Sequence, residues 1–514
     1  MKITQRSSHP AIDLALDTLE SGKQALVFVD TKSSAEKTAE DIARAVRGVQ
    51  NEELLGLSQK IYRALPSPTK QCKRLAISVK KGIAFHHAGL VAKQRELIEY
   101  GFRNGMVKII CATPTLAYGV DTPAFRVILK SLKRYSGKWG ADWIPVLEYH
   151  QMAGRAGRPN FHDTHGEAIA LAKSSIEHDE IHARYVMGEP EEVFSKLAVE
   201  PVLRTYVLSL IATDFARTKK QLIDFFSRTF WAHQYKDMLQ LERVIDKVLH
   251  LLERWEFVEL KQDFVSAADM DEEPVVATLL GRRVAQLYID PFTAQYLIKG
   301  LRKKYTHVFA LFQLISHTLE MRPLLRVRAK EQEQVQATLL EHYEQLLEME
   351  PSVYDPSYDE FLDSIKTAMF FHDWVDEQTE EQLLGTYNVR PGEIRAKIAS
   401  ADWLLYAAEE LCPLLELHSS LTEIKKLRVR VKYGVREELL TLLRLKSVGR
   451  VRARKLYRNG LKTIADVKAV DEGQLAQIVG KVIASSIKEQ LGQKKTVKIG
   501  KRKGQMGIEK YRQA

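Results

Sequence analysis

Two arginines stand close together in the string Gln151-Met-Ala-Gly-Arg-Ala-Gly-Arg158-Pro159. Because Arg155 and Arg158 are three residues apart, we expect them to lie on adjacent turns of a helix and to face one ligand. The small residues between them allow close approach to the backbone. Arginine binds phosphate oxygens through two parallel hydrogen bonds and stays charged. The string therefore predicts a phosphate-binding site, with Gln151, Arg155 and Arg158 as candidate catalytic residues.

A second polar string, residues 111–123, directly follows a predicted strand and reads Cys-Ala-Thr-Pro-Thr-Leu-Ala-Tyr-Gly-Val-Asp-Thr-Pro. The hydroxyls of Thr113 and Thr115, with exposed backbone amides, can hold a nucleic-acid phosphate. Gly119 permits a tight turn. Asp121 can accept a hydrogen bond from a ribose or from an arginine. This string predicts a second contact surface beside the first.

The first third of the chain supplies the elements that must position these strings. Apolar runs rich in β-branched residues predict strands at Ala25–Val29, Gly82–Phe85, Val107–Cys111, Arg126–Leu129 and Glu167–Leu171. Amphipathic spacing predicts helices between several of them, such as Ser34–Val46 and Ala92–Phe102. This alternation is typical of a parallel sheet covered by helices, in which ligands meet the loops at the carboxyl ends of strands.

Beyond this region helical spacing dominates, so we expect several small helical domains. Residues Pro201–Leu260 predict three helices and then a strand pair, Phe257–Leu260 with Phe264–Ala267. That order is typical of a winged helix, and a plain helical connector is the alternative.

The 514 residues include 77 Lys and Arg against 66 Asp and Glu, a formal net charge of +11. Such an excess favours a polyanionic partner. It gathers in Leu443–Asn459, with seven basic and no acidic residues, and from Lys494 to the end of the sequence, with eight basic and one acidic. The tail either contacts DNA or is solvated disorder. Three distant cysteines exclude a disulfide framework and a Cys-rich zinc site, no metal site is predicted, and no apolar run of about 18 residues predicts a membrane helix.

Four strings, in order, resemble the motifs of superfamily 2 helicases. Leu26–Glu36 resembles motif IV, Gly82–Leu90 the HHAGL loop, 111–123 motif V, and Gln151–Pro159 motif VI. More narrowly, the chain resembles the archaeal Ski-two-like DNA helicases of fork repair, the HELQ type. The resemblance implies that ATP is bound by Gly119, Asp121, Gln151, Arg155 and Arg158. It also implies DNA contacts from Thr31, His87, Gly89, Thr113 and Thr115.

Residues 131–147 resemble a β-hairpin insertion that wedges a duplex open. Tyr135, Trp139 and Trp143 are its candidate DNA contacts, because an aromatic ring can stack on the last base pair. An ordinary loop with buried tryptophans is the alternative.

A predicted ratchet helix, Pro391–Leu411, carries Arg395 and Trp403 as candidate DNA contacts. Trp403 shares a face with small residues, which would leave its ring free to stack on a base, or it is a core residue. Leu445–Tyr457 resembles a helix-hairpin-helix, in which the backbone at Gly449 offers amides to a DNA phosphate. Arg450, Arg452 and Arg454 would add affinity that falls with salt.

The predicted fold class is an α/β RecA-like parallel-sheet domain followed by mainly α domains. We expect a second RecA-like domain at 1–190, a winged helix at 191–276, a helical ratchet at 277–420, a helix-hairpin-helix at 421–492 and a basic tail at 493–514.

The resemblance implies an ATP-dependent helicase that moves 3′ to 5′ on single-stranded or forked DNA in replication-fork repair. Such a helicase also needs a GxxxxGK[ST] phosphate loop and a DExH box that holds Mg²⁺, and neither is identified. We therefore expect the C-terminal half of the helicase, inactive alone as an ATPase. ATP and Mg²⁺ are the expected cofactors, with Mg²⁺ held mainly by the first RecA-like domain of a separate partner chain. We expect it to be cytoplasmic and nucleoid-associated. A non-catalytic DNA-binding module or truncated product, and an RNA helicase, are the alternatives.

Overall fold

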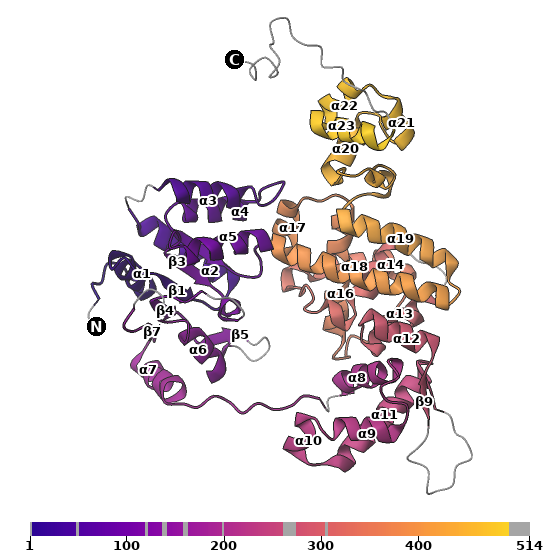
Figure 1. Ribbon diagram of the computed structural model, residues 1–514, viewed down its shortest axis with the longest axis horizontal. Coiled ribbons are helices and arrows are strands. Elements are labelled where there is room, and N and C mark those ends of the chain that lie inside the picture. The colour runs from indigo at the N-terminus through magenta and orange to yellow at the C-terminus, as the bar shows by residue number, and fades with distance from the viewer. Residues whose placement is uncertain are drawn as a thin grey trace, which may run out of the picture.

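The computed structural model describes residues 3–47, 51–118, 122–135, 141–157, 163–197, 200–260, 274–303 and 307–492. An α/β domain lies beside a helical bundle, with a smaller helical unit at each end of that bundle (Figure 1). Among the described residues, no helix is long and apolar enough to cross a membrane.

Five parallel strands form the sheet of the α/β domain, in the order β2-β3-β1-β4-β7. They are β1 (Ala25–Phe28), β2 (Ile83–His86), β3 (Ile109–Ala112), β4 (Arg126–Leu129) and β7 (Glu167–Ala170). Every residue of the first four strands is buried, as expected where helices cover both faces of a parallel sheet. The predicted fold class is confirmed, and each predicted apolar run overlaps a strand.

The helices of this domain are α1 (Pro10–Glu20), α2 (Lys32–Ala45), α3 (Glu52–Tyr62), α4 (Lys70–Val79), α5 (Ala92–Arg103), α6 (Val146–Ala153) and α7 (Ser175–Ile181). Helix α2 illustrates why the sequence forms them. The Thr31 hydroxyl accepts a hydrogen bond from the Ser34 amide and caps the helix. Ala35, Ala39 and Ile42 then recur at helical spacing and are buried.

A buried arginine joins three elements of this domain. The side chain of Arg126, on β4, is only 2% exposed. Its Nε donates to Glu167 of β7 at 2.6 Å, and its Nη1 donates to Asp17 of α1 at 2.8 Å. The same nitrogen reaches Thr18 and the Leu14 carbonyl. The guanidinium thus fastens helix α1 to the edge of the sheet.

Between β4 and α6, strand β5 (Lys133–Tyr135) pairs antiparallel with β6 (Ala141–Trp143). These two strands therefore form the arms of a hairpin. Only Ile144 and Pro145 separate the second arm from helix α6, so the hairpin is joined almost directly to the helix that carries Gln151.

The next unit contains α8 (Glu200–Ala212), α9 (Lys219–Phe226), α10 (Phe230–Tyr235) and α11 (Met238–Arg254), followed by β8 (Val258–Leu260) and β9 (Val275–Ala277). Strands β8 and β9 pair antiparallel. The expected partner strand, Phe264–Ala267, lies outside the described residues. The expected domain boundary at residue 276 falls inside β9, and the apolar residues of this unit share one continuous core with the helices that follow.

Those helices are α12 (Leu279–Leu287), α13 (Pro291–Leu301), α14 (Val308–Ser316), α15 (Gln332–His342), α16 (Tyr358–Val375), α17 (Glu380–Tyr387), α18 (Pro391–Leu414) and α19 (His418–Tyr433). Helix α14 is buried from Phe309 to Ser316, which marks it as the centre of the bundle. Helix α18, the long helix expected to carry Trp403, packs along α19.

The last unit has a separate core. Its helices are α20 (Arg450–Arg458), α21 (Ile464–Ala469), α22 (Glu472–Val479) and α23 (Lys481–Gln490). The expected basic tail, residues 493–514, lies outside the described residues.

Replacing Arg126 by Met should destabilise the α/β domain by about 3 kcal/mol, because Asp17 and Glu167 lose a partly buried partner. This value is at the lower end of the destabilisation usual for removing one partner of a buried ion pair, because both carboxylates keep some contact with solvent. Urea unfolding measures the change. Arg63 is exposed and has no side-chain partner among the described residues, so Arg63→Met should change the free energy of unfolding by no more than about 0.5 kcal/mol. Equal effects of the two substitutions would contradict this role for Arg126.

Candidate functional site

A cleft of about 650 Å³ lies between the α/β domain and the helical bundle. Thr31 at the start of α2 lines it from the α/β domain, together with Thr113 and Thr115, which follow β3. The hydroxyls of Thr113 and Thr115 are 3.0 Å apart. Arg390 and Glu393, at the start of α18, line the opposite wall. Three of the expected phosphate contacts therefore share one cleft.

The cleft wall also holds charged residues that sequence reasoning missed. Lys32 forms an ion pair with Glu393 across the two domains. Arg134, from the hairpin, forms an ion pair with Glu148 of α6. No local pattern marks these residues, because each is an ordinary charged side chain until the fold brings its partner close.

His87 and Gly89 lie elsewhere than expected. His87 is fully buried; its Nδ1 accepts a hydrogen bond from the Gly89 amide at 3.1 Å, and its Nε2 is 3.2 Å from Glu36 Oε1. A Cβ on Gly89 would lie 2.4 Å from Arg390 Cδ. The expectation that these two residues contact DNA is corrected in this arrangement, since the helical bundle covers both.

The helical bundle is held there by Glu36, whose carboxylate is almost completely buried. Arg390 Nε donates to Glu36 Oε1 at 2.9 Å, and Gln71 donates to the same oxygen at 2.8 Å. Arg74 donates to Oε2 at 2.7 Å. The Gly392 amide also donates to the Gly89 carbonyl at 2.9 Å. The HHAGL loop is therefore a joint between domains.

Charge at this joint depends on pH. Burial alone would raise the pKa of Glu36, but the neighbouring His87 and Arg390 outweigh it and hold that pKa well below its usual range. Burial, as the largest cause, lowers the pKa of His87. Both groups therefore release protons on folding, which favours the folded joint at neutral pH.

A second pocket, of about 500 Å³, is lined by Ala117, Tyr118, His150, Gln151, Gly154 and Arg155. It brings motif V and motif VI together. The Arg155 guanidinium donates a hydrogen bond to the Ala117 carbonyl. The described residues take one of its five N–H donors, so the others remain for an anion and the pocket can accept phosphate oxygens.

The arginine string is not helical as expected. Helix α6 ends at Ala153, and the Ala124 amide donates to the Arg155 carbonyl at 2.9 Å. Gly157 has a φ of +98°, and a Cβ on Gly166 would lie 2.3 Å from the Gly157 nitrogen. The chain leaves the helix because these glycines let two backbone segments touch. Arg155 is therefore presented from a turn.

Four expected contacts, Arg158, Gly119, Asp121 and Trp139, lie outside the described residues. The backbone of Tyr135 pairs with Ala141 in the hairpin. The side chain of Tyr135 is not part of what the structure describes.

Trp143 packs at the base of the hairpin. The Lys133 ammonium is 4.1 Å from its ring centre, and the Tyr185 ring is 5.9 Å away in an edge arrangement. Trp143 is therefore half-buried against Lys133 and Tyr185, and its stacking on a base pair stays a prediction.

Residues of the segment 182–197 bind the short link between the hairpin and helix α6. The buried Tyr185 hydroxyl donates to the Ile144 carbonyl at 2.7 Å. Glu191 accepts from the amides of Val146 at 2.6 Å and Leu147 at 3.1 Å. Pro145 offers this helix no side-chain cap, so a residue far along the chain supplies one. Hydrogen bonds at Val193 and Ser195 tie the same segment to Gln234 of α10.

On α18, Arg395 forms an ion pair with Glu380. Trp403 is 36% exposed, and its Nε1 donates to the Leu287 carbonyl at 2.9 Å. The indole is therefore neither a core residue nor the free ring that was expected, because one edge is tied to α12.

Two of the three C-terminal arginines point into the protein. Arg454 forms a paired hydrogen bond with Glu377, at 2.8 and 2.6 Å. Arg450 donates to the Gln378 carbonyl at 2.7 Å and lies 5.0 Å from the Trp374 ring centre. The expectation of DNA contact is corrected for both, since they dock the last unit onto the bundle. Arg452 is exposed, beside Gly449 at the start of α20.

The residues Asp179–His182 do match the letters DExH, contrary to the expectation that no such box occurs. However, Asp179 and Glu180 are exposed on α7. A working DExH box follows a buried strand, where its carboxylates face the nucleotide, so this match has the wrong position.

A parallel α/β domain with a phosphate-accepting turn after α6, followed by helical units, defines the C-terminal motor half of a superfamily 2 helicase. Three family models agree: the helicase conserved C-terminal domain matches residues 10–160, archaeal helicase domain 4 matches 309–434, and the SAM-like helix-hairpin-helix tandem matches 439–493.

Curated relatives named ATP-dependent DNA helicase Hel308 match along most of the chain. That of Methanocella arvoryzae is 39% identical over 94% of this chain and 64% of its own length. That of Pyrococcus abyssi is 36% identical over 95% and 67%, and that of Methanococcus vannielii 34% identical over 94% and 68%. The chain belongs to the Hel308 family and spans about two thirds of the length of these relatives.

Acid should weaken the domain joint. Because Glu36 and His87 have lower pKa values folded than unfolded, their contribution is complete above about pH 6.5 and is lost progressively below it. Urea midpoints at pH 7.5 and pH 5 measure this loss. His87→Gln should reduce the difference between the two midpoints, whereas the exposed His9→Gln should leave it as in the wild type. The same pH response in both variants would contradict the role of His87.

Removing the remote helix cap should loosen α6. Glu191→Ala leaves the amides of Val146 and Leu147 without an acceptor, so both should exchange with deuterium several-fold faster. Its neighbour Glu192 is exposed and has no partner among the described residues. Glu192→Ala removes the same charge and should leave those exchange rates unchanged; faster exchange in that control would show that charge alone matters.

Proposed function

We propose that this chain is the second motor domain and DNA-binding half of an ATP-dependent DNA helicase. In this proposal the helicase moves 3′ to 5′ on single-stranded or forked DNA during replication-fork repair. The observation that carries the proposal is that the α/β domain lines both the pocket, at Gln151 and Arg155, and one wall of the cleft, at Thr31, Thr113 and Thr115. In this proposal the pocket receives phosphate and the cleft receives a strand.

Tyr118 supports the coupling of the two sites. It lines both the cleft and the pocket, and it directly follows the short helix Pro114–Ala117, which contains Thr115. A strand that displaces this segment would change the wall of the nucleotide pocket. Helicases need such a connection, since ATP hydrolysis must alter the grip on DNA.

ATP would be held on this chain by Gln151 and Arg155, and by Arg158, Gly119 and Asp121 as the resemblance implies. Arginine side chains there stabilise the charge that develops on the transferred phosphoryl group. The bound nucleotide would bring Mg²⁺, which neutralises phosphate charge. The 514 residues hold no GxxxxGK[ST] sequence, so we propose that a first RecA-like domain on a separate chain supplies the phosphate loop and the Mg²⁺ carboxylate.

Purified alone, the chain should bind single-stranded DNA without hydrolysing ATP. Adding a first RecA-like domain should produce DNA-stimulated hydrolysis, and Arg155→Ala should lower kcat by at least about 100-fold, because an electrostatic partner of the transition state is lost. A coupled ATPase assay measures this. Arg63→Ala, on the exposed end of α3, is the matched control.

Three outcomes separate the alternatives. Full hydrolysis by the mixture containing Arg155→Ala contradicts the assigned nucleotide site. DNA binding without hydrolysis in any mixture identifies a non-catalytic binding module. Stronger competition by RNA than by DNA of the same sequence identifies an RNA helicase.

A further inference from the structure

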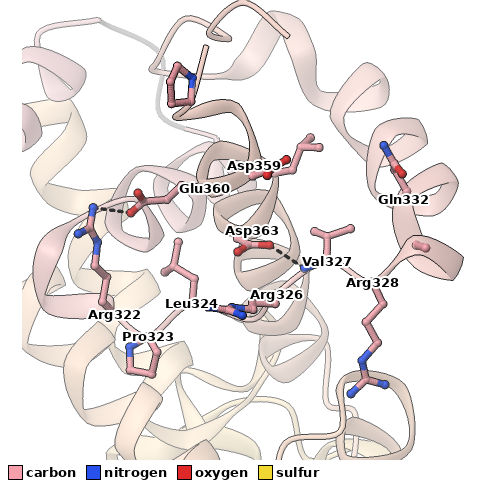
Figure 2. Close-up of a pocket in the computed structure, with 13 residues that line it drawn as sticks. Arg322, Pro323, Leu324, Arg326, Val327, Arg328, Gln332, Asp359, Glu360 and Asp363 are labelled. Carbon is pink, nitrogen blue, oxygen red and sulfur yellow. Dashed lines mark hydrogen bonds and ion pairs between the residues drawn. The ribbon is translucent and has the colours of Figure 1, made fainter. Parts of the chain in front are cut away.

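A further cavity lies in the helical bundle, and its lining shares no residue with the cleft or the pocket described above. Its volume is about 970 Å³, and its lining runs along residues 322–329 and the start of α16. Figure 2 shows Arg322, Arg326 and Arg328 on one side of it, with Asp359, Glu360 and Asp363 of α16 opposite. None of the residues expected from sequence to bind DNA or ATP lines this cavity.

The segment carrying the arginines is extended but firmly anchored. The amides of Leu325 and Val327 donate to Thr367 at 3.1 Å and to Asp363 at 2.6 Å. The carbonyl of Arg326 accepts from Lys366 at 2.8 Å, and that of Pro323 accepts from Lys397 at 2.8 Å. Side chains of α16 and α18 thus take the hydrogen bonds that a neighbouring strand would otherwise make.

Anchoring of this kind leaves two arginine side chains available. Arg322 forms an ion pair with Glu360. In contrast, the guanidinium groups of Arg326 and Arg328 are exposed and make no hydrogen bond or ion pair with a described residue. Two guanidiniums without a described hydrogen-bond or ion-pair partner therefore stand on an anchored segment. In Figure 2 the Arg326 side chain is directed toward Leu324, and the Arg328 side chain extends away from it.

The carboxylates of the lining leave both guanidiniums without a direct partner. Glu360 is engaged by Arg322, and Asp363 accepts the Val327 amide. Asp359 is exposed. The three arginines and three carboxylates of the lining balance in charge, so the availability of Arg326 and Arg328 rests on their exposure and on their lack of a hydrogen bond or ion pair with a described residue.

The anchored segment lies next to the cleft. Lys397, which holds Pro323, is on α18 four residues after Glu393 and seven after Arg390. Residues at this spacing share a helix face, and four residues rise by about 6 Å. Arg390 and Glu393 line the cleft between the domains. One helical turn along α18 therefore leads from the cleft wall to Lys397, which holds Pro323, and Arg326 and Arg328 follow three and five residues later in the anchored segment.

We propose that Arg326 and Arg328 bind phosphates of the single strand as it passes between the cleft and the helical bundle. This proposal rests on the function proposed above. The recognised chemistry is the sugar-phosphate backbone, so the contact is independent of base sequence. Rigid phosphate contacts outside the motor domain would keep hold of the strand while the cleft opens and closes.

Fluorescence anisotropy of labelled oligo(dT) with the full chain tests the proposal, between about 50 and about 200 mM salt. Each phosphate contact with a single strand contributes about 0.7 to the slope of log affinity against log salt. Arg326→Gln with Arg328→Gln should therefore lower the slope by about 1.4 and weaken binding at low salt about tenfold. Replacing both arginines by Lys should restore most of the slope, because the charge returns.

The matched control removes the same charge from exposed α3, as Lys60→Gln with Arg63→Gln, and should keep the wild-type slope. If the wild type fails to bind oligo(dT), the proposed function fails. If the wild type binds and the Arg326 and Arg328 double variant keeps the wild-type slope, this inference is overturned while the proposed function stands. Unchanged thermal unfolding shows that each variant is folded.

Discussion

The arrangement of the whole chain depends on one buried carboxylate. Glu36 accepts hydrogen bonds from Arg390, Gln71 and Arg74 in a site closed to water. A carboxylate buried in this way is tolerable only when several donors satisfy it. The helical bundle supplies one of those donors, and the α/β domain supplies the other two. The cleft that holds the three threonines exists because this pairing sets the two domains side by side.

Much of the basic charge serves structure. Arg126, Arg390, Arg450 and Arg454 each join elements or units through carboxylates and carbonyls. The excess of +11 is therefore a poor guide to where a polyanion binds. Exposed arginines without partners, such as Arg326 and Arg328, are better candidates, because binding DNA does not require them to abandon an internal contact.

Short connections link the hairpin, helix α6 and the helical unit that contains α10. The hairpin leads into α6 after two residues, and α6 leads directly to Arg155. Glu191 caps this helix from the segment that is itself tied to α10. A displacement of the turn that carries Arg155 would therefore also move the hairpin and the helical unit that contains α10. The structure joins these parts with short polar contacts, which transmit movement without a large interface.

The sequence by itself determined the α/β fold class, the five strands and the order of the helical units, because periodicity and turn residues act over short distances. It also predicted Gln151, Arg155 and the cleft threonines as contacts, from residue type and the loops they occupy. Only the tertiary structure decided that His87, Gly89, Arg450 and Arg454 are covered, that Trp143 and Trp403 are tied down, and that Glu36 is a joint. Each depends on a partner from a remote part of the chain; Glu36 and Arg390, for example, are 354 residues apart. Burial and pairing across such distances leave no periodic signal, so local sequence cannot distinguish a structural arginine from one that binds DNA.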